Sequence, residues 1–433
     1  MQLVAYGAQD IYLTGNPQIT FFKVVYRRHT NFAVESIEQT FNGTADFNKR
    51  VTATISRNGD LIQQMYLEVV LPVPDGVTGS KWTYGIGNAL IKQAEIEIGG
   101  QLIDRQYGDW MNIWTELTIP AGKRDGYDNM VGNAIKSGGD TSQCGGIVQA
   151  TAPRLYVPFQ FWFNRNPGLA LPLIALQYHE VKLNLELRPI GDLLQDGTTA
   201  ATGSLTTCKL YVDYVYLDTD ERRRFAQVSH EYLIEQVQFT GTETIAKGST
   251  NKNITLNFNH PVKELIWAHT NSNCAVAGLT LPAGSWFNYS GSDGVHNSVT
   301  TGTDSFKTAL LQLNGHDRFS VRNADYFRKV QNYEHHTRVP RVGVDIAGTS
   351  SGDIQASFRQ YIYSYSFALS PEEHQPSGTC NFSRIDNAVL QMAYSNADED
   401  SETYANSLNL NIYAVNYNVL RIMSGMGGLA YSN

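Results

Sequence analysis

Long apolar runs are missing from this sequence. The longest, GLALPLIAL at 168–176, is about half of the roughly 20 residues that a membrane-spanning helix needs. The N-terminal stretch MQLVAYGAQD has no basic segment and reaches Asp10 early, which argues against a signal peptide. We therefore expect a soluble protein that is synthesised in the cytosol.

Cysteine and runs of positive charge are also scarce. The four cysteines are far apart and form no C-x-x-C pair, which argues against a zinc knuckle or a disulfide framework and favours free thiols: Cys144, Cys208, Cys274 and Cys380. Charged residues make up 17% of the chain and the net charge is -8. The only basic clusters, YRRH at 26–29 and ERRR at 221–224, predict salt bridges at subunit or domain edges. Direct binding of nucleic acid is not expected.

The histidines form no pattern typical of a metal site. A jelly-roll metal site of the cupin type needs H-x-H, which the chain lacks. HEYLI at 230–234 starts like a zincin helix but has Ile234 where the second ligand must be. His335 and His336 are adjacent, and neighbours on a helix diverge by about 100°. We predict no metal and no other cofactor.

Two further motifs suggest catalytic residues, but the sequence around each motif does not support that interpretation. GTSSG at 348–352 would make Ser350 a nucleophile only between a strand and a helix, but a strand pattern follows it, so a turn is favoured. Glu95 and Glu97 alternate with isoleucines, which predicts that both carboxylates face solvent rather than forming a glycosidase pair. The sequence therefore predicts a protein that is not an enzyme.

What the chain does contain is typical of β-structure. It has 24 Tyr and 37 Gly, and apolar residues alternate with polar or small ones in short stretches. This alternation predicts strands packed on one face at 51–55, 157–163, 181–187, 254–258 and 361–369. We predict an all-β chain.

One pattern occurs twice. IEQTFNGT at 37–44 returns as IEQVQFTGT at 234–242, which is an offset of 197 between Ile37 and Ile234. Four more pairs keep the same order at similar offsets: 50–61 with 253–265, 96–105 with 311–318, 156–168 with 361–373, and 181–187 with 387–393. An ordered repeat of this kind predicts an internal duplication.

Helices and loops interrupt both copies at similar places. GDWMNIWTEL places Trp110, Ile113, Trp114 and Leu117 on one helical face, and ADYFRKVQNY does the same with Tyr326, Val330 and Tyr333. The charged stretch 217–232 is interpreted as a linker. Polar, Gly-rich insertions are predicted to be surface loops at 120–150, 191–206, 271–304 and 343–353. Two units of roughly 200 residues suit eight-stranded jelly-roll β-sandwiches.

Several long stretches resemble a known family from end to end. They are QLVAYGAQDIYLTGNPQITFFKVVYRRHTNF (2–32), SRNGDLI (56–62), NPGLALPLIALQYHEVKL (166–183), HEYLIEQVQFTG (230–241), QPSGTCNFSRIDNA (375–388) and YNVLRIMSGMGGLAYSN (417–433). These stretches closely resemble the major capsid proteins of chlorella viruses and related large icosahedral DNA viruses. The insertions at 120–150, 191–206, 271–304 and 390–407 look individual to this chain.

The resemblance implies a double jelly roll, two tandem sandwiches with short helices in loops. The expected division is an N-terminal arm at 1–24, a first jelly roll at 25–217, a linker at 218–231 and a second jelly roll at 232–433. The resemblance also implies a homotrimer with a pseudo-hexagonal outline in the outer shell of the virion, assembled in the host cytoplasm. Implied partners are neighbouring capsomers, minor capsid proteins beneath the shell, and the host cell surface through outer loops.

Glycosylation is a further implication. Four N-x-S/T sequons occur, at Asn42, Asn253, Asn288 and Asn381, and Asn288 is expected to be the most exposed because it lies in a long polar loop. The resembling capsid proteins carry glycans on asparagines outside the usual sequon, mostly in outer loops of the second sandwich. Position alone makes Asn288 and Asn297 the candidates here.

Two alternatives stay open on the same fold. The chain could be a minor capsid paralogue at special shell positions, or a carbohydrate- or receptor-binding spike that uses the aromatic and Asn-rich loops around 267–300. A jelly-roll glycosidase lacks an identifiable pair of acid and nucleophile.

Overall fold

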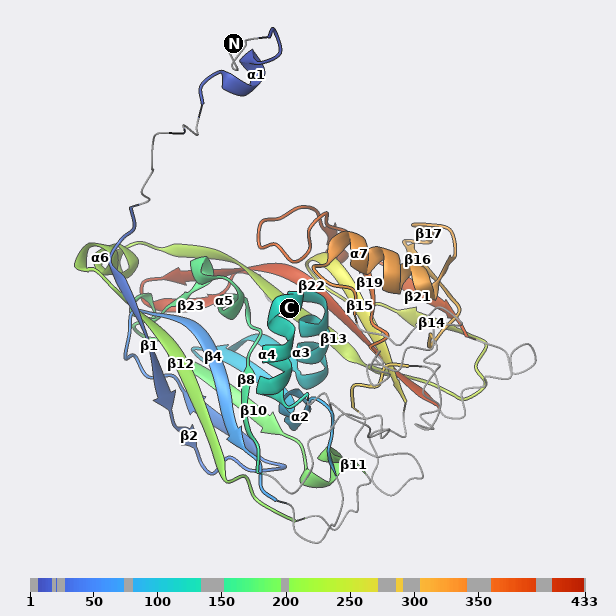
Figure 1. Cartoon of the computed structure of the whole chain (residues 1–433), viewed down its shortest axis with the longest axis horizontal. Helices are drawn as coiled ribbons and strands as arrows, with labels where there is room; N and C mark the ends of the chain where they lie inside the picture. The colour runs from blue at the N-terminus through green and yellow to red at the C-terminus, as the bar shows by residue number, and fades with distance from the viewer. Residues whose placement is uncertain are drawn as a thin grey trace, which may run out of the picture.

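Two β-sheet bodies lie side by side in the computed structural model of the chain (Figure 1). The structure describes residues 7–17, 21, 28–73, 81–133, 152–195, 202–271, 286–290, 304–340, 360–394 and 407–431. We call the body formed by β1 to β12 the first unit and the body formed by β13 to β23 the second unit. The N-terminal segment with α1 (Ile11–Thr14) extends away from both.

The first unit contains two antiparallel sheets. One has the order β1-β12-β4-β8, formed by β1 (Phe32–Gln39), β12 (Thr207–Leu217), β4 (Leu61–Val70) and β8 (Arg154–Pro158), and β9 (Leu171–Pro172) also pairs with β4. The other has the order β2-β3-β10-β6-β7, formed by β2 (Phe41–Asn42), β3 (Arg50–Thr54), β10 (Val181–Leu187), β6 (Ile91–Ile98) and β7 (Gln101–Tyr107). A separate ladder joins β5 (Lys81–Trp82) and β11 (Leu194–Gln195).

The second unit repeats this arrangement. Its first sheet has the order β13-β22-β15-β19, formed by β13 (His230–Ile245), β22 (Leu408–Met423), β15 (Pro261–Asn271) and β19 (Tyr363–Ser366), with β20 (Cys380–Asn381) on β15 and β23 (Met426–Leu429) on β22. Its second sheet has the order β14-β21-β16-β17, formed by β14 (Asn251–Thr255), β21 (Ala388–Ala393), β16 (Thr308–Leu313) and β17 (His316–Asp317), with β18 (Arg322–Asn323) on β16.

The two strand orders match position by position. Once the short β2 and the off-path strands β9, β18, β20 and β23 are set aside, each unit has two four-strand paths, and β1, β12, β4 and β8 correspond to β13, β22, β15 and β19. The second sheets correspond in the same way. The five repeated sequence pairs fall on these corresponding strands, and the two IEQ segments lie in β1 and β13. The predicted duplication is therefore confirmed as a double jelly roll.

Alternation along the central strands builds the core. In β10, Leu183 and Leu185 are fully buried, and Leu183 lies opposite Ala53 on β3 and Ile96 on β6. Residues two apart share one face of a strand, so the leucines point into the sandwich while Lys182 points away. Burial of one such leucine stabilises the fold by about 1.5–3 kcal/mol.

Helices enter both units between corresponding strands. The first unit has α2 (Ile86–Leu90), α3 (Gly108–Thr118), α4 (Ala121–Val131) and α5 (Trp162–Arg165), and the second has a π-helical turn, η5 (Tyr326–Val330), that continues into α7 (Gln331–His335). Short 3-10 turns are η1 (Pro167–Leu169), η2 (Leu173–Ala175), η3 (Ile190–Leu193) and η6 (Phe382–Arg384). The predicted helix at 108–117 is confirmed, and its four apolar residues are buried.

Some local predictions are wrong. The strand predicted at 157–163 ends at Pro158, because Phe161 and Phe163 are buried around the short helix α5 instead. The second helix exists, but Tyr333 is 79% exposed and Val330 40% exposed, so its buried face is not the predicted one. The strand predicted at 361–369 is shorter in the structure, where β19 ends at Ser366, and Leu369 beyond its end is 77% exposed.

The loop and linker regions hold more regular structure than expected. Helix α4 occupies the start of the loop predicted at 120–150, and η3 with β11 occupies the start of 191–206. The insertion at 343–353 lies outside the described residues. The charged stretch between the units folds as α6 (Thr219–Gln227), where the Asp218 carboxylate accepts the Thr219 amide at 2.7 Å.

Candidate functional site: the seam between the two units

The seam is the region where the two units touch, and its centre is the contact of β7 with β13. The Gln236 side-chain amide donates to the Ile103 carbonyl, and the Val237 amide donates to the Asp104 carboxyl at 3.2 Å. Burial raises the pKa of Asp104 to about 7, although the Val237 amide and the charge of Arg165 act in the opposite direction. Two adjacent residues of β13 are thus bonded to two adjacent residues of β7.

A buried ion cluster continues the seam. The Glu235 carboxylate accepts from the Arg165 guanidinium at 3.1 Å and lies 2.8 Å from the Lys263 ammonium. Arg165 comes from the first unit and also stacks 4.2 Å from the centre of the Trp114 ring. Burial alone would raise the pKa of Glu235, but His374 and the two cations hold it at about 2. Glu235 therefore stays ionised and links the units.

His336 forms a second buried cluster within the second unit. Its Nε2 lies 3.1 Å from the Glu264 carboxylate and its Nδ1 lies 3.0 Å from the Glu372 carboxylate. The imidazole and Glu264 are fully buried. Burial alone would lower the pKa of His336, but the two carboxylates outweigh it and raise that pKa to about 9. Glu372 also accepts the Thr337 amide at 2.9 Å.

The charged groups of the two ion clusters are paired within each cluster: Glu235 with Arg165 and Lys263, and His336 with Glu264 and Glu372. Among the residues that the structure describes, no group of His, Cys, Asp and Glu is placed to hold a metal ion. His336 lies between carboxylates, whereas His335 contacts the Leu369 carbonyl at 3.0 Å, so the two neighbours face different partners.

The prediction that Glu95 faces solvent is wrong. It lies on the outer face of β6 as its alternation indicates, but Arg50 and Arg105 cover it at 2.6 and 2.7 Å and leave it 4% exposed. Glu97 is half-buried and accepts from Asn184 at 2.6 Å. The alternation gives the face of the strand, but it does not show which long side chains fold over that face.

The other catalytic motifs gain no support. His230 opens strand β13, where its Nε2 contacts the Phe225 carbonyl at 2.9 Å, so HEYLI is not helical. Ser350 lies outside the described residues.

The expected exposure of Asn288 is wrong. Asn288 is 9% exposed, and its carboxamide oxygen accepts the Ser290 amide at 3.2 Å. The short segment around it is buried because Phe287 and Tyr289 pack into the core. Asn297 lies outside the described residues. The other three sequon asparagines, Asn42, Asn253 and Asn381, are exposed.

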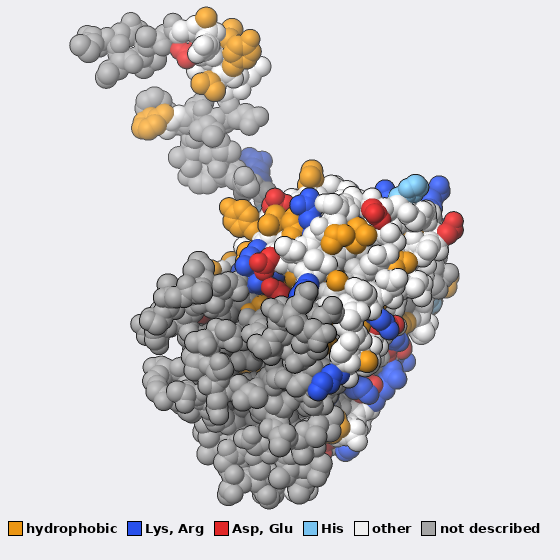
Figure 2. Space-filling view, turned by 90° about the vertical axis from the view of Figure 1, so that its right-hand side faces the viewer, with side chains coloured by type: hydrophobic (Ala, Val, Ile, Leu, Met, Phe, Trp, Pro, Cys, Tyr) orange, Lys and Arg blue, Asp and Glu red, His pale blue; other side chains and the backbone are white. Residues whose placement is uncertain are grey.

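Surface charge forms no single basic face in the view of Figure 2. There the described Lys and Arg side chains lie among Asp and Glu side chains. Within the ERRR cluster, Arg222 pairs with Asp60 of the first unit at 3.0 Å, as the salt-bridge prediction requires. In the described ranges, no helix has the length and apolar character to cross a bilayer.

Sequence reasoning missed the seam itself. The repeat marks the place of Glu235 but not its burial, since Glu235 corresponds to Glu38 at the offset of 197. Glu38 is 41% exposed and pairs with Lys209 at 2.9 Å on the surface. The same residue type at the same place in the duplication is therefore a surface acid in one unit and a buried link in the other. Only the packing of one unit on the other distinguishes them.

Comparison with known proteins agrees with this fold along the whole chain. The model of the major capsid protein N-terminus matches residues 20–218, and the model of the large eukaryotic DNA virus major capsid protein matches 221–346 and 355–428. The major capsid protein of Pyramimonas orientalis virus is 54% identical, and that of Paramecium bursaria Chlorella virus 1 is 46% identical. Each alignment covers 100% of this chain and 99% of the relative.

A solved structure gives the same result. The VP54 protein of PBCV-1 superposes with a TM-score of 0.75 at 40% identity, over 96% of this chain and 100% of that one. Two jelly rolls in tandem, each interrupted by helices between corresponding strands, define a double jelly-roll capsid protein. The chain belongs to the major capsid protein family of large eukaryotic DNA viruses. Its relatives are structural proteins of the virion capsid.

Proposed function

We propose that this chain is the main shell subunit of a large icosahedral DNA virus, and that three copies assemble into a pseudo-hexagonal capsomer. The observation that carries the proposal is the repeated strand order of the two units. Three chains with two similar sandwiches each supply six similar wedges. Head-to-tail contacts between such wedges close into a ring when the rotation that relates one chain to the next returns to the first chain after three steps.

The internal seam suggests which surfaces meet between chains. Strand β7 of the first unit contacts β13 of the second, and the corresponding strands of the opposite units are β17 and β1. Both are open in the single chain, because β17 is exposed at both residues and β1 is exposed at six of its eight positions. We infer that β17 of one chain contacts β1 of the next, in a copy of the internal seam.

Corresponding residues support this pairing. Asp104 of β7 corresponds to Asp317 of β17 at the offset of 213. Asp104 accepts a β13 amide in the seam, whereas Asp317 is exposed and bonds only locally, to Gln312 at 2.7 Å. On the other side, Phe32 and Val34 of β1 are 58% and 51% exposed. These apolar side chains provide area that a neighbouring chain would bury.

Light scattering and electron imaging of the purified full chain test the assembly. We expect the mass of a trimer and particles with a hexagonal outline and three-fold symmetry. A stable monomer at high protein concentration contradicts the proposal.

A pair of substitutions tests the contact. Val34→Glu is expected to place a charge in the β1 contact and shift the trimer toward monomer, while Val73→Glu, at a valine that is 52% exposed outside β1, leaves it intact. A trimer that tolerates Val34→Glu as well as Val73→Glu would disprove the β1 contact but not the trimer.

The N-terminal arm has a separate proposed role. Ile11, Tyr12 and Leu13 are each more than two-thirds exposed on α1, which extends away from the units (Figure 1). We propose that residues 1–24 form a tie on the inner side of the shell, followed by the jelly rolls at 25–217 and 232–433 with 218–231 as linker. Deletion of 1–24 should leave the trimer intact and block its incorporation into shells. Normal incorporation would argue against the tie.

The remaining partners follow from a place in the outer shell. They are neighbouring capsomers, minor capsid proteins beneath the shell and, through outer loops, the host cell surface, with no direct contact to nucleic acid and with synthesis and assembly in the host cytoplasm. Glycosylation at Asn288 or Asn297 stays a prediction. Glycopeptide mapping of protein from virions tests it, and the burial of Asn288 makes Asn297 the stronger candidate.

The alternatives are a minor capsid paralogue and a carbohydrate- or receptor-binding spike on the same fold. The number of copies per virion separates them from the main subunit. The main subunit forms most of the shell mass, whereas a paralogue or spike is present in few copies.

A further inference from the structure

A cavity of about 300 Å³ lies between the two units, apart from the ion clusters of the seam. The first unit contributes Tyr107, Asp109 and Arg188, and the second contributes Phe239, Trp286 and Asn411. The volume is at the lower end of the range for small-molecule sites. It suits one small ring rather than a chain of rings.

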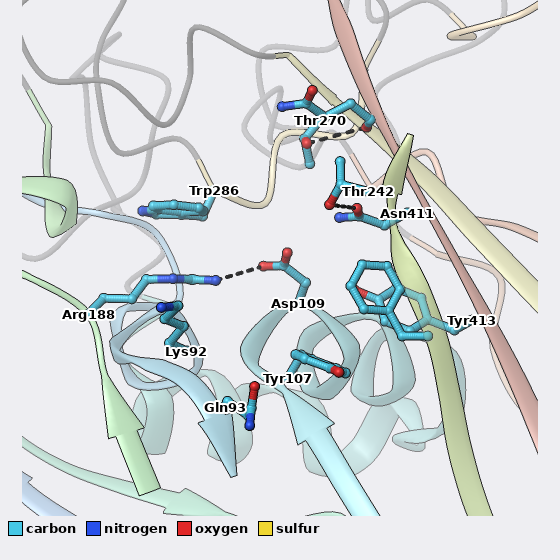
Figure 3. Close-up of a pocket in the computed structure, with 12 residues that line it drawn as sticks. Lys92, Gln93, Tyr107, Asp109, Arg188, Thr242, Thr270, Trp286, Asn411 and Tyr413 are labelled. Carbon is cyan, nitrogen blue, oxygen red and sulfur yellow. Dashed lines mark hydrogen bonds and ion pairs between the residues drawn. The ribbon is translucent and has the colours of Figure 1, made fainter. Parts of the chain in front are cut away.

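Aromatic rings form two of its walls (Figure 3). On one side Phe239 stacks on Tyr413 with ring centres 4.9 Å apart and meets the edge of Tyr107 at 5.0 Å. On the other side the Arg188 guanidinium stacks 3.9 Å from the centre of the Trp286 ring, and the Trp286 indole donates to the Asp192 carbonyl at 2.8 Å. Both walls are thus fixed by contacts within the protein.

An incompletely bonded carboxyl lies between these walls. Asp109, in the first turn of α3, is directed into the cavity, and its Oδ1 is buried without a hydrogen-bond partner among the described residues. The nearest cation, the Arg188 guanidinium, is 3.7 Å from this oxygen, which is too far for a hydrogen bond. A buried polar atom in this state is costly unless a further group bonds to it.

The space between the Asp109 carboxyl and the Arg188 guanidinium can hold one hydroxyl group. An oxygen at about 2.8 Å from each of two atoms fits across 3.7 Å, where it would donate to Asp109 and accept from Arg188. A carbonyl only accepts and an ammonium only donates, so neither satisfies both groups. Across the cavity, Thr242 donates to the Asn411 carboxamide oxygen at 2.7 Å and leaves the Asn411 NH₂ group directed toward the cavity (Figure 3).

The charge balance disfavours an ionic ligand. Arg188 faces Asp109, and Lys92 at the rim is paired with Glu186 at 2.6 Å. A ligand with hydroxyls for the polar groups and C–H faces for the aromatic rings fits better. We propose that this cavity binds a neutral monosaccharide ring, with one hydroxyl between Asp109 and Arg188 and a second on Asn411. The proposal does not depend on the shell role, because a single chain supplies every contact.

Saturation-transfer NMR on the purified full chain tests this, with D-glucose, D-galactose, D-mannose, D-xylose and N-acetyl-D-glucosamine as probes. We expect transfer to at least one of these sugars. Asp109→Asn should weaken its affinity about tenfold or more, since a hydrogen bond to a charged group is lost. The control Asp125→Asn, at an exposed position of α4, should leave the affinity unchanged.

A second variant keeps the test decisive if Asp109→Asn does not fold. Asn411→Ala removes the facing amide and one bond to Thr242, and it should weaken the same sugar about tenfold. The proposal is overturned if none of the five sugars receives saturation. It is also overturned if the folded variants at both positions bind as well as the unchanged protein.

Discussion

The buried imidazole of His336 should make the second unit sensitive to alkaline pH. Its pKa is raised from 6.5 to about 9 because two carboxylates outweigh the effect of burial. The protonated ring is therefore favoured in the folded state. The stabilisation is fully present below pH 6.5 and is lost as the pH rises through about 9.

The size of the effect follows from this pKa. One pH unit of pKa difference corresponds to about 1.4 kcal/mol, so the rise to about 9 corresponds to about 3 kcal/mol of folding free energy. The ring is fully buried, so solvent does not screen the interaction. Above that pH, the ring that lies between buried Glu264 and half-buried Glu372 no longer carries the compensating positive charge.

Urea unfolding at a series of pH values measures this difference. The free energy of unfolding of the unchanged protein minus that of His336→Gln should fall by about 3 kcal/mol between pH 6.5 and 9. His29→Gln, at an exposed position outside β1 and β17, is the control. A difference between the unchanged protein and His336→Gln that stays constant over this interval would refute the reasoning.

Three further predictions concern the seam and its surroundings. Glu235→Gln should destabilise the fold by about 3–5 kcal/mol in urea unfolding, because it leaves buried cations uncompensated. The control Glu38→Gln, at the corresponding exposed position, should cost about 1 kcal/mol or less. Equal costs for the two variants would contradict the role of Glu235 as a buried link between the units. Asp104→Asn should gain stability relative to the unchanged protein as the pH rises from 3.8 through about 7, since the raised pKa favours the neutral carboxyl; a difference that does not change with pH would exclude this. Gly108→Ala should lower the melting temperature and cost about 1–3 kcal/mol, because a Cβ there collides with the Asn88 carbonyl; an unchanged melting temperature would show that the backbone yields.

The sequence allowed the repeated architecture to be predicted because each strand carries its own signal. Alternation in 181–187 places Leu183 and Leu185 in the core, and the apolar spacing in 108–117 places a helix where α3 lies. The ordered offsets then match corresponding strands of two units. These signals are local, so they do not depend on how the units pack.

The rest of the site depends on long-range packing. Glu95 is buried because Arg50 and Arg105, from other strands, fold over it. Asn288 is buried because its two aromatic neighbours enter the core. Cavity and seam residues such as Asp109 come together only when the second unit covers the first. The periodicity of residues within one strand does not predict how the two units pack on each other.

The pair Glu38 and Glu235 has a consequence for the history of the chain. The two glutamates occupy matching places in the duplication, yet one meets solvent and the other holds two buried cations. Selection should therefore act on them unequally, with drift tolerated at the first and resisted at the second. A hybrid built by joining two copies of the first half would keep Glu38 at the matching place and Arg165, which the first unit supplies, but would lack Lys263, which the second unit supplies.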